Sequence, residues 1–207
     1  MNKSSWPTDF FVLCEKLIET KRFSDTPEMT NKESVADHSW KLAVMALIIK
    51  EAYSIDIDAT KAIKIALIHD LVEAVVGDTD YSLVFAGLIK HEDKAAKELE
   101  GMKILKSTLD QDMGREIEAL WLEYENGSSV EGRYIKALDK IEGIDHPIYR
   151  NMVKFNPEKL ANYADKAISN FPDLLPLLKD TKLRLKAFYE ENDIPWEEKY
   201  NYGLETN

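Results

Sequence analysis

The sequence predicts an all-α protein, folded as one compact bundle of several helices. Apolar residues recur at three- and four-residue spacing through most of the 207 residues, which is the period of an amphipathic helix. β-Branched residues do not alternate over any long stretch, so strands are not expected. We find no internal repeat or low-complexity tract. The chain is therefore expected to form a single domain over residues 1–207.

The spacing of apolar residues sets the expected helices. In chain order they are about 8–18, 33–53, 59–76, 91–107, 113–124, 129–147, 157–169 and 172–191. Residues 22–31 break the spacing with serine, aspartate, proline and asparagine and are expected to form a loop. Residues 77–90 are expected to form a loop with one helical turn.

Helix-capping residues support these boundaries. Thr8 and Asp9 offer a cap and a negative first turn to the first helix. Asp58 is expected to cap the third helix, and Gly77 to end it. Ser129 follows the break Asn-Gly-Ser and opens the helix that continues to about residue 147. These signals predict consecutive helices joined by short loops.

Charge and composition exclude several classes of protein. The chain has 27 Lys and Arg against 38 Asp and Glu, a net charge of −11, which disfavours a nucleic acid polymer or an anionic membrane surface as partner. The longest apolar run, 42–49, is far shorter than the roughly 20 residues that span a bilayer. The single Cys14 allows no internal disulfide. With no secretory signal at the start of the sequence, a cytoplasmic location is expected.

A histidine and two acids gather near the end of the third predicted helix. His69 and Asp70 are adjacent and Glu73 follows one turn later, so the three can share a helix face. Imidazole and carboxylate together form a nitrogen and oxygen set that suits Mn, Fe, Co or Zn. The alternative is a hydrogen-bonded core histidine at a helix end with two solvated acids, and this segment alone leaves both interpretations open.

Two further residues favour the metal site. His38 lies on the apolar stripe of the preceding helix, where a buried histidine must be satisfied by a partner. That partner is a backbone carbonyl or, across a helical hairpin, a metal shared with His69 and Asp70. Asp139 sits beside an apolar position and offers a fourth ligand; otherwise it is a surface acid between Lys136 and Lys140.

These segments carry a resemblance to a known family. Ser34-Val35-Ala36-Asp37-His38-Ser39, then Ala66-Leu67-Ile68-His69-Asp70-Leu71-Val72-Glu73, then Gly77-Asp78, then Ala137-Leu138-Asp139 resemble the HD-domain phosphohydrolase superfamily, whose signature is the ordered pattern H…HD…D. The context is similar to the bacterial 5′-deoxynucleotidases and their eukaryotic homologues. The resemblance covers a motif core of about 22–146, followed by C-terminal helices and a tail over 157–207.

The resemblance implies a fold, an activity and a metal site. It implies an all-helical HD-domain bundle that removes phosphate from (deoxy)ribonucleoside 5′-monophosphates, which are small-molecule substrates. One divalent ion would be held by the ligands His38, His69, Asp70 and Asp139. Co²⁺ or Mn²⁺ is the expected ion, with Zn²⁺, Fe²⁺ or Mg²⁺ as alternatives. Members of the family tend to form homodimers.

Further site residues are implied by the same resemblance. Glu73 and Asp78 match acids that exchange protons during the reaction, in an order that the sequence leaves open. Because these acids oppose a phosphate dianion, a fixed cation is required, and Arg22 has a planar fork suited to phosphate. Without the resemblance, Arg22 reads as a loop residue paired with Asp25 or Glu28.

Phe23 differs from the residue that the bacterial 5′-deoxynucleotidases have at the matching position. The bacterial enzymes carry tryptophan at this position, against the sugar, so the preference for deoxyribose over ribose is not predicted. Two hypotheses compete with this function. The protein hydrolyses another nucleotide substrate of the superfamily, or it is a regulatory protein that binds metal and nucleotide without catalysis. His91 and His146 are expected at the surface, and Trp121 and Tyr124 in the core or an interface.

Overall fold

The computed structural model describes residues 6–23, 32–153 and 155–204, and within these ranges it contains helices and no strand. The elements, in chain order, are α1 (Trp6–Glu19), α2 (Val35–Ala52), α3 (Ala59–Ile68), α4 (Glu73–Val76), α5 (Tyr81–Phe85), α6 (His91–Ser107), α7 (Gln111–Asn126), α8 (Val130–Tyr149), α9 (Pro157–Ala161), α10 (Asp165–Ser169), the 3₁₀ helix η1 (Pro172–Leu174), α11 (Leu175–Glu191) and the 3₁₀ helix η2 (Glu198–Tyr200). The all-α prediction is confirmed. Across the described ranges, no helix has both the length and the apolar character that crossing a membrane requires.

The capping residues explain where the central helices begin. Ser34 accepts a hydrogen bond from the Asp37 backbone, and the Asp37 carboxylate accepts one from the Ser34 backbone, a reciprocal capping box that starts α2. Asp58 caps α3 and Ser129 caps α8, each through a side-chain oxygen that accepts a backbone N–H. The predicted starts of these three helices are confirmed to within one or two residues.

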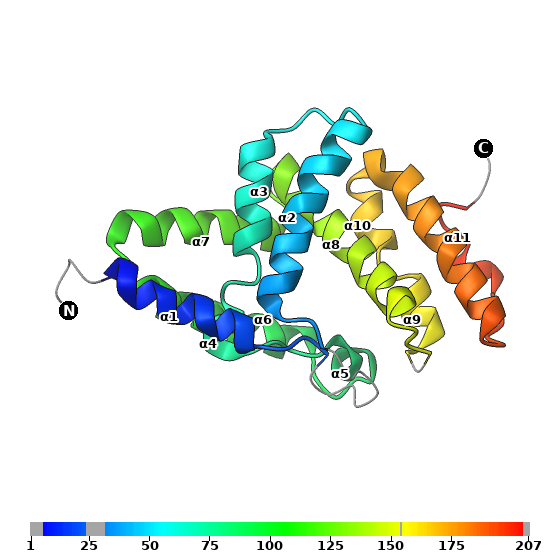
Figure 1. The fold of residues 1–207 in the computed structure, drawn as a ribbon, viewed down its shortest axis with the longest axis horizontal. Helices are drawn as coiled ribbons and strands as arrows, with labels where there is room; N and C mark the ends of the chain where they lie inside the picture. Colours follow the sequence, from blue (N-terminus) through cyan, green and yellow to red (C-terminus); the bar gives the residue numbers. More distant parts are fainter. Residues whose placement is uncertain (1–5, 24–31, 154, 205–207) are drawn as a thin grey trace.

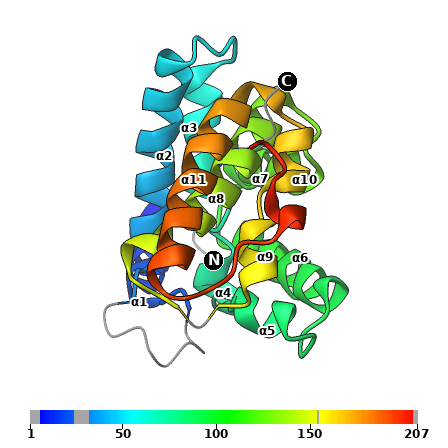
Figure 2. The ribbon, with the colours of Figure 1, turned by 90° about the vertical axis from the view of Figure 1, so that its right-hand side faces the viewer.

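Helix α8 lies between the α2–α3 pair and α11, and this arrangement places the core (Figures 1 and 2). The larger apolar core lies among α2, α3, α8, α10 and α11, with residues such as Leu42, Ile65, Leu138 and Leu185 fully enclosed. A smaller core joins α1, α4, α6 and α7 around Met102. Because α2, α3 and α8 all contact one another, residues on their facing sides can meet at one point.

The third predicted helix is broken at the segment that carries its histidine. Helix α3 ends at Ile68, residues 69–72 form turns with bonds between residues three apart, and α4 begins at Glu73. Gly77 ends α4 in a positive-φ conformation (φ 75°), which a residue without a Cβ adopts easily, so that predicted boundary is correct. The expectation of one continuous helix is wrong.

Other differences are smaller. The segment predicted as a single helix over 157–169 is two short helices, α9 and α10, separated by a turn at 162–164. Helix α1 begins at Trp6 rather than after Thr8. On α6, where the spacing of apolar residues predicted an amphipathic helix, Met102 and Leu105 are buried whereas Leu99 is 47% exposed. The loop expected over 22–31 lies mostly outside the described residues.

The aromatic residues that follow α11, Trp196 and Tyr200, pack against the rest of the domain. Trp196 contacts the rings of Tyr189 and Tyr200 at centroid distances of 5.8 and 5.4 Å. The fully buried Lys182 of α11 donates to the Tyr200 carbonyl at 3.0 Å and pairs with Asp165 of α10 at 2.7 Å. These contacts join α10, α11 and the tail.

Candidate active site

The four expected metal ligands converge from three helices. His38 lies one turn into α2, His69 at the C-terminal end of α3 with Asp70 in the turn after it, and Asp139 in the middle of α8. His38 Nε2 lies 3.2 Å from Asp139 Oδ1 and 3.8 Å from Asp70 Oδ2. His69 Nε2 lies 3.1 Å from the same Asp70 oxygen. The contacts among α2, α3 and α8 therefore produce one cluster of nitrogen and oxygen donors.

A backbone contact sets the orientation of His69. Its Nδ1 lies 2.8 Å from the carbonyl oxygen of Ala66, one turn earlier on α3. Because a carbonyl oxygen can only accept, Nδ1 carries the hydrogen and Nε2 presents its lone pair to the cluster. The main chain of α3 thus holds this imidazole in the form that binds a metal.

The donor set fits a divalent metal ion. Among the described residues, Nε2 of His38 and Nε2 of His69 are buried and have no hydrogen-bond partner. A buried nitrogen without a partner is destabilising, and coordination removes that cost. Two imidazoles and two carboxylates also match the ligand preference of Mn, Fe, Co and Zn. The residues present are consistent with the predicted metal centre.

The electrostatics of the cluster favour added positive charge. Burial and Arg22 lower the pKa of His38, but the carboxylates of Glu142 and Asp139 outweigh them and raise it to about 9. Burial raises the pKa of Asp139, but Lys140 and His38 outweigh burial and hold it well below its usual range. The cluster therefore takes up a proton readily, and a metal ion can replace that proton.

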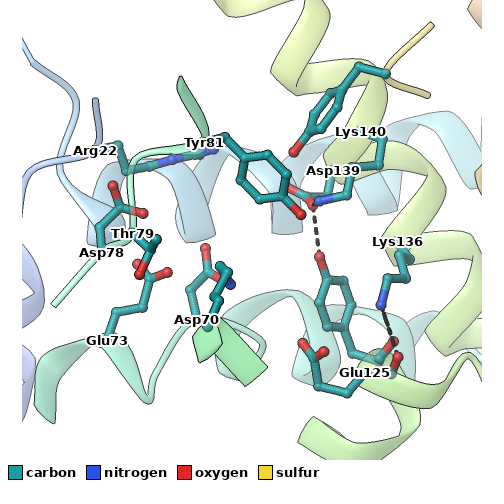
Figure 3. A pocket seen from close by; sticks show the side chains of 13 residues that line it. Arg22, Asp70, Glu73, Asp78, Thr79, Tyr81, Glu125, Lys136, Asp139 and Lys140 are labelled. Atoms are coloured by element: carbon teal, nitrogen blue, oxygen red, sulfur yellow. Dashed lines mark hydrogen bonds and ion pairs between the residues drawn. The ribbon is translucent and has the colours of Figure 1, made fainter. Parts of the chain in front are cut away.

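Further side chains contact the oxygen and nitrogen donors of the cluster. The Tyr124 hydroxyl donates to Asp139 Oδ2 at 2.7 Å, and the Lys140 ammonium donates to the same oxygen at 2.7 Å (Figure 3). These contacts leave Oδ1 facing His38. On the other ring nitrogen of His38, Glu142 Oε2 lies 3.1 Å from Nδ1. Such partners orient metal ligands and are nearly as important as the ligands themselves.

These three partners were not predicted as site residues. Tyr124 is buried, as expected, but it also lines the cleft beside Asp139. Glu142 follows Asp139 by three residues on the helix that was expected to carry the ligand, so helical spacing contained that signal. Lys140 was considered only as a solvated neighbour of Asp139, yet its side chain is 16% exposed.

Arg22 reaches the site through short backbone pairing. Lys21 forms an isolated antiparallel bridge with Ser34, and Arg22 N–H donates to the Glu33 carbonyl at 2.9 Å. The guanidinium group lies 3.5 Å from Glu33 and 3.6 Å from Glu142, both too long for a tight fork. The alternative partners, at positions 25 and 28, lie outside the described residues. Arg22 therefore faces the cleft with donors that are only loosely engaged.

Phe23 and His146 form a stacked pair next to this arginine. Phe23 has a left-handed backbone (φ 57°), and its ring lies parallel to that of His146 at 5.4 Å. His146 is only 5% exposed, so the expectation of a surface histidine is wrong; α8 continues through Pro147 to Tyr149 and turns this ring inward. His91 is exposed, as expected.

A polar cleft connects these residues. Figure 3 shows Arg22, Glu73 and Asp78 on one side of it, Asp139, Lys140 and Lys136 on the other, and Asp70 between them. The remaining lining residues are Thr79, Tyr81, Lys94, Tyr124, Glu125 and Tyr163. The structure thus brings Asp70, Asp139, the two expected acids and the expected cation into one cavity. His38 and His69 contact the two aspartates from buried positions outside its lining.

The two acids sit in surroundings that disfavour their charged forms. Burial, with Asp70 and Asp78 nearby, raises the pKa of Glu73 well above its usual range. Burial also raises the pKa of Asp78 to about 6, although Arg22 opposes this shift. Pairs of carboxyls with displaced pKa values are typical of acid and base catalysts.

Three lysines in the cleft were missed by the sequence analysis. Lys94 pairs with Glu98, Lys140 pairs with Asp139, and Lys136 donates to the Glu125 carbonyl at 2.9 Å. Their ammonium groups reduce the excess of negative charge that Glu73, Asp78 and Glu125 would create. The arginine is therefore not the only cation near a bound anion, contrary to the simple charge argument made from the sequence.

The fold and motif geometry agree with a known family. The family model of the HD domain matches residues 14–168, which is most of the chain. The chain belongs to the HD-domain family. This HD-domain protein is 33% identical to the 5′-deoxynucleotidase HDDC2 of Homo sapiens, over 72% of this chain and 70% of the relative. The HDDC2 of Dictyostelium discoideum is 32% identical, over 86% and 96% of the two chains.

Solved structures share the fold of this HD-domain protein. A conserved hypothetical protein from Pyrococcus furiosus matches with a TM-score of 0.65 and 28% identity, covering 85% of this chain and 99% of that one. A structure from Magnetospirillum magnetotacticum, titled as a predicted metal-dependent phosphohydrolase, matches with a TM-score of 0.59 and 25% identity, covering 92% and 95%.

Proposed function

We propose that this HD-domain protein is a metal-dependent phosphomonoesterase that hydrolyses (deoxy)ribonucleoside 5′-monophosphates to nucleoside and inorganic phosphate. The observation that carries the proposal is the cluster of His38, His69, Asp70 and Asp139, in which both Nε2 atoms make no hydrogen bond and face carboxylate oxygens. Asp70 and Asp139 line the same cleft as Arg22. The 5′-deoxynucleotidases that the chain resembles at about a third identity support this substrate class.

The four clustered residues are the proposed ligands of one divalent ion. Co²⁺ or Mn²⁺ is preferred, and Zn²⁺, Fe²⁺ or Mg²⁺ are alternatives. Such an ion polarises a phosphoryl oxygen and lowers the pKa of water. Tyr124 and Lys140 hold Asp139 in position for it, and the Ala66 carbonyl holds His69.

The remaining residues bind the phosphate and move protons. Hydrolysis joins a water oxygen to phosphorus and breaks the bond to the 5′ oxygen of the nucleoside. The water loses a proton and the 5′ oxygen gains one, and Glu73 and Asp78 are the proposed carriers of these protons. Arg22 is the proposed phosphate ligand because its fork is loosely engaged and points into the cleft. Phe23, next to it, is the proposed contact to the sugar.

We further propose that the protein works as a cytoplasmic homodimer, with the whole chain as one domain. A stripe of exposed apolar residues on α2 supports the dimer: Trp40 is 67% exposed, and Val44, Leu47 and Ile48 continue the same face. Light scattering coupled to gel filtration gives the mass. Trp40→Glu is expected to yield a monomer, and a monomeric parent protein would contradict this proposal.

Phosphate release from a panel of nucleotides tests the proposed reaction. Metal-stripped protein is resupplied with Co²⁺, Mn²⁺, Zn²⁺ or Mg²⁺ and given 5′-monophosphates of both sugars and their 3′ isomers. Metal-dependent release from the 5′ compounds alone is expected. Stoichiometric metal binding without release from any nucleotide would contradict the proposal and favour a regulatory protein.

A further inference from the structure

A buried ion pair on α6 faces the polar cleft. Lys94 and Glu98 pair four residues apart, with side chains that are 18% and 10% exposed. Another ion pair on the same helix, Lys103 with Glu100, has side chains that are 62% and 64% exposed. Lys94 also lines the cleft that holds Asp70. The Lys94–Glu98 pair is therefore withdrawn from solvent and directed toward the site, unlike an ordinary surface pair.

Helix stability does not explain the Lys94–Glu98 pair. Lys94 is close to the start of α6 at His91, where the helix dipole disfavours a cation. An ion pair four residues apart is more favourable with the acid first, whereas here the lysine comes first. Burial adds a cost, because both charged side chains lose water. A pair with these disadvantages is better explained by what the lysine does in the cleft.

Gly101 keeps this face of α6 close to α4. Gly101 and Lys94 are two helical turns apart and share a helix face. A Cβ at Gly101 would lie 2.7 Å from the side chains of Val72 and Val76, so a larger residue would push the helices apart. Helices α4 and α6 are in contact in the fold (Figure 1). This close packing brings Lys94 to the cleft that Glu73 also lines.

The Lys94 ammonium has donors available for a ligand. Among the residues that the structure describes, Glu98 is its one hydrogen-bond partner, whereas an ammonium has three N–H donors. The other cleft lysines are more fully engaged. Lys136 donates to two backbone carbonyls of α7, at 2.9 and 3.3 Å. Lys140 donates to Asp139 at 2.7 Å and lies over two tyrosine rings. Lys94 is therefore the cleft lysine best able to bind an added anion.

The surroundings of Lys94 keep it positively charged. Burial lowers the pKa of Lys94, but the Glu98 carboxylate outweighs burial and raises it, and Asp70 and Glu73 add to this effect. A phosphate dianion in the cleft must approach the last two of these carboxyls, and a fixed cation among them offsets the repulsion. The phosphate also has three acceptor oxygens, more than the fork of Arg22 can engage. A second cation thus has an oxygen to bind.

We propose that Lys94 is a catalytic residue that binds an oxygen of the substrate phosphate, and that Glu98 positions its ammonium. The ligand class is a phosphomonoester dianion, or the inorganic phosphate released from it. Arg22 and Lys94 then engage different oxygens of one phosphate. This inference rests on the proposed function for the identity of the substrate, whereas binding of the anion can be measured without turnover.

Binding of inorganic phosphate tests the inference. Titration calorimetry with Mn²⁺-loaded protein measures the dissociation constant of phosphate, and mass spectrometry measures the metal content. Lys94→Met is expected to raise this constant about ten- to a hundredfold, as the loss of one charged hydrogen bond implies, with the metal content unchanged. KM for a 5′-monophosphate is expected to rise as well. Lys97→Met removes an exposed lysine from the same helix and is the matched control, with no change expected.

Two further variants separate binding from folding. Lys94→Met leaves the Glu98 carboxylate buried without its cation, which destabilises the fold. Combining Lys94→Met with Glu98→Leu replaces the pair by apolar side chains, so the urea midpoint is expected to stay near that of the parent while phosphate binding stays weak. Glu98→Gln alone is expected to weaken phosphate binding less than Lys94→Met does. Added to Lys94→Met, it is expected to have no further effect on phosphate binding, because it acts through the lysine.

Three outcomes would overturn the inference. They are a parent protein that binds no phosphate, an unchanged phosphate affinity in both variants that lack Lys94, or an equal loss in Lys97→Met. Additive losses from Glu98→Gln and Lys94→Met would overturn the role of Glu98. If phosphate binds through Lys94 but no nucleotide is hydrolysed with any metal, the proposed function fails and the anion site stands. Nucleotide turnover with a phosphate affinity independent of Lys94 overturns only the present inference.

Discussion

Replacing Arg22 tests the phosphate end of the cleft. Its side chain is 15% exposed, and its guanidinium lies 3.5 and 3.6 Å from Glu33 and Glu142, so neither carboxylate holds it tightly. Arg22→Ala should leave the metal ligands in place, because Arg22 is not one of them. Losing one buried, charged contact to phosphate costs about 2–4 kcal/mol. At 1.36 kcal/mol per factor of ten, kcat/KM falls about 30- to 1,000-fold.

Steady-state kinetics with a 5′-monophosphate, together with metal analysis by mass spectrometry, measures both effects. Arg22→Lys is expected to lie between the parent and Arg22→Ala, since an ammonium keeps the charge without the fork. Lys21→Ala removes the neighbouring exposed cation, which donates to the Ile18 carbonyl, and is expected to have no effect. Loss of metal from Arg22→Ala, or unchanged kcat/KM, would refute the assigned role.

Three further predictions concern the metal, acid stability and the C-terminal packing. Asp70→Ala is expected to lose both bound metal and activity, since this carboxylate faces both histidines; retained metal by mass spectrometry would contradict it. Burial lowers the pKa of His146 from 6.5 to about 4. The unfolded chain therefore binds this proton at a higher pH than the folded protein does. The free energy of unfolding should fall by about 3 kcal/mol as the pH decreases from 6.5 to about 4. Urea titrations of metal-free protein and of His146→Phe measure this; an equal pH dependence in both would disprove it. Lys182→Met leaves Asp165 without its cation and should lower the urea-derived free energy of unfolding by about 3 kcal/mol; an unchanged midpoint would show that the pair does not stabilise the fold.

The helices were predictable because their signals are local. The cap at Asp58, the cap at Ser129 and the turn at Gly77 each act over a few residues, and each was found where the sequence indicated. The break after Ile68 was not predictable from spacing, because the apolar pattern continues across it. Tertiary packing of Leu71 and Val72 into the smaller core accompanies that break.

The site was partly predictable because its motif consists of residue types that supply nitrogen and oxygen ligands to a metal. The adjacent pair His69-Asp70, with His38 before it and Asp139 after it, indicated a metal centre through residue type and order. Nothing local marked Lys94 as a cleft residue, since it is one of several lysines on a charged helix. The burial of His146 was equally hidden, because it depends on a helix that continues past Pro147.

By itself, the sequence determined the helical class, the starts of the central helices and the residue types of the proposed metal ligands, since these depend on neighbours within one or two turns. Only the tertiary structure decided that the ligands meet, that Glu142 and Tyr124 support them, and that Lys94 lines the cleft. The rotation of α2, α3 and α8 about their axes is set by the shared core, whose contacts join residues distant in the chain. Helical spacing determines the face of its own helix on which a residue lies, whereas only packing determines which neighbouring helix that face contacts.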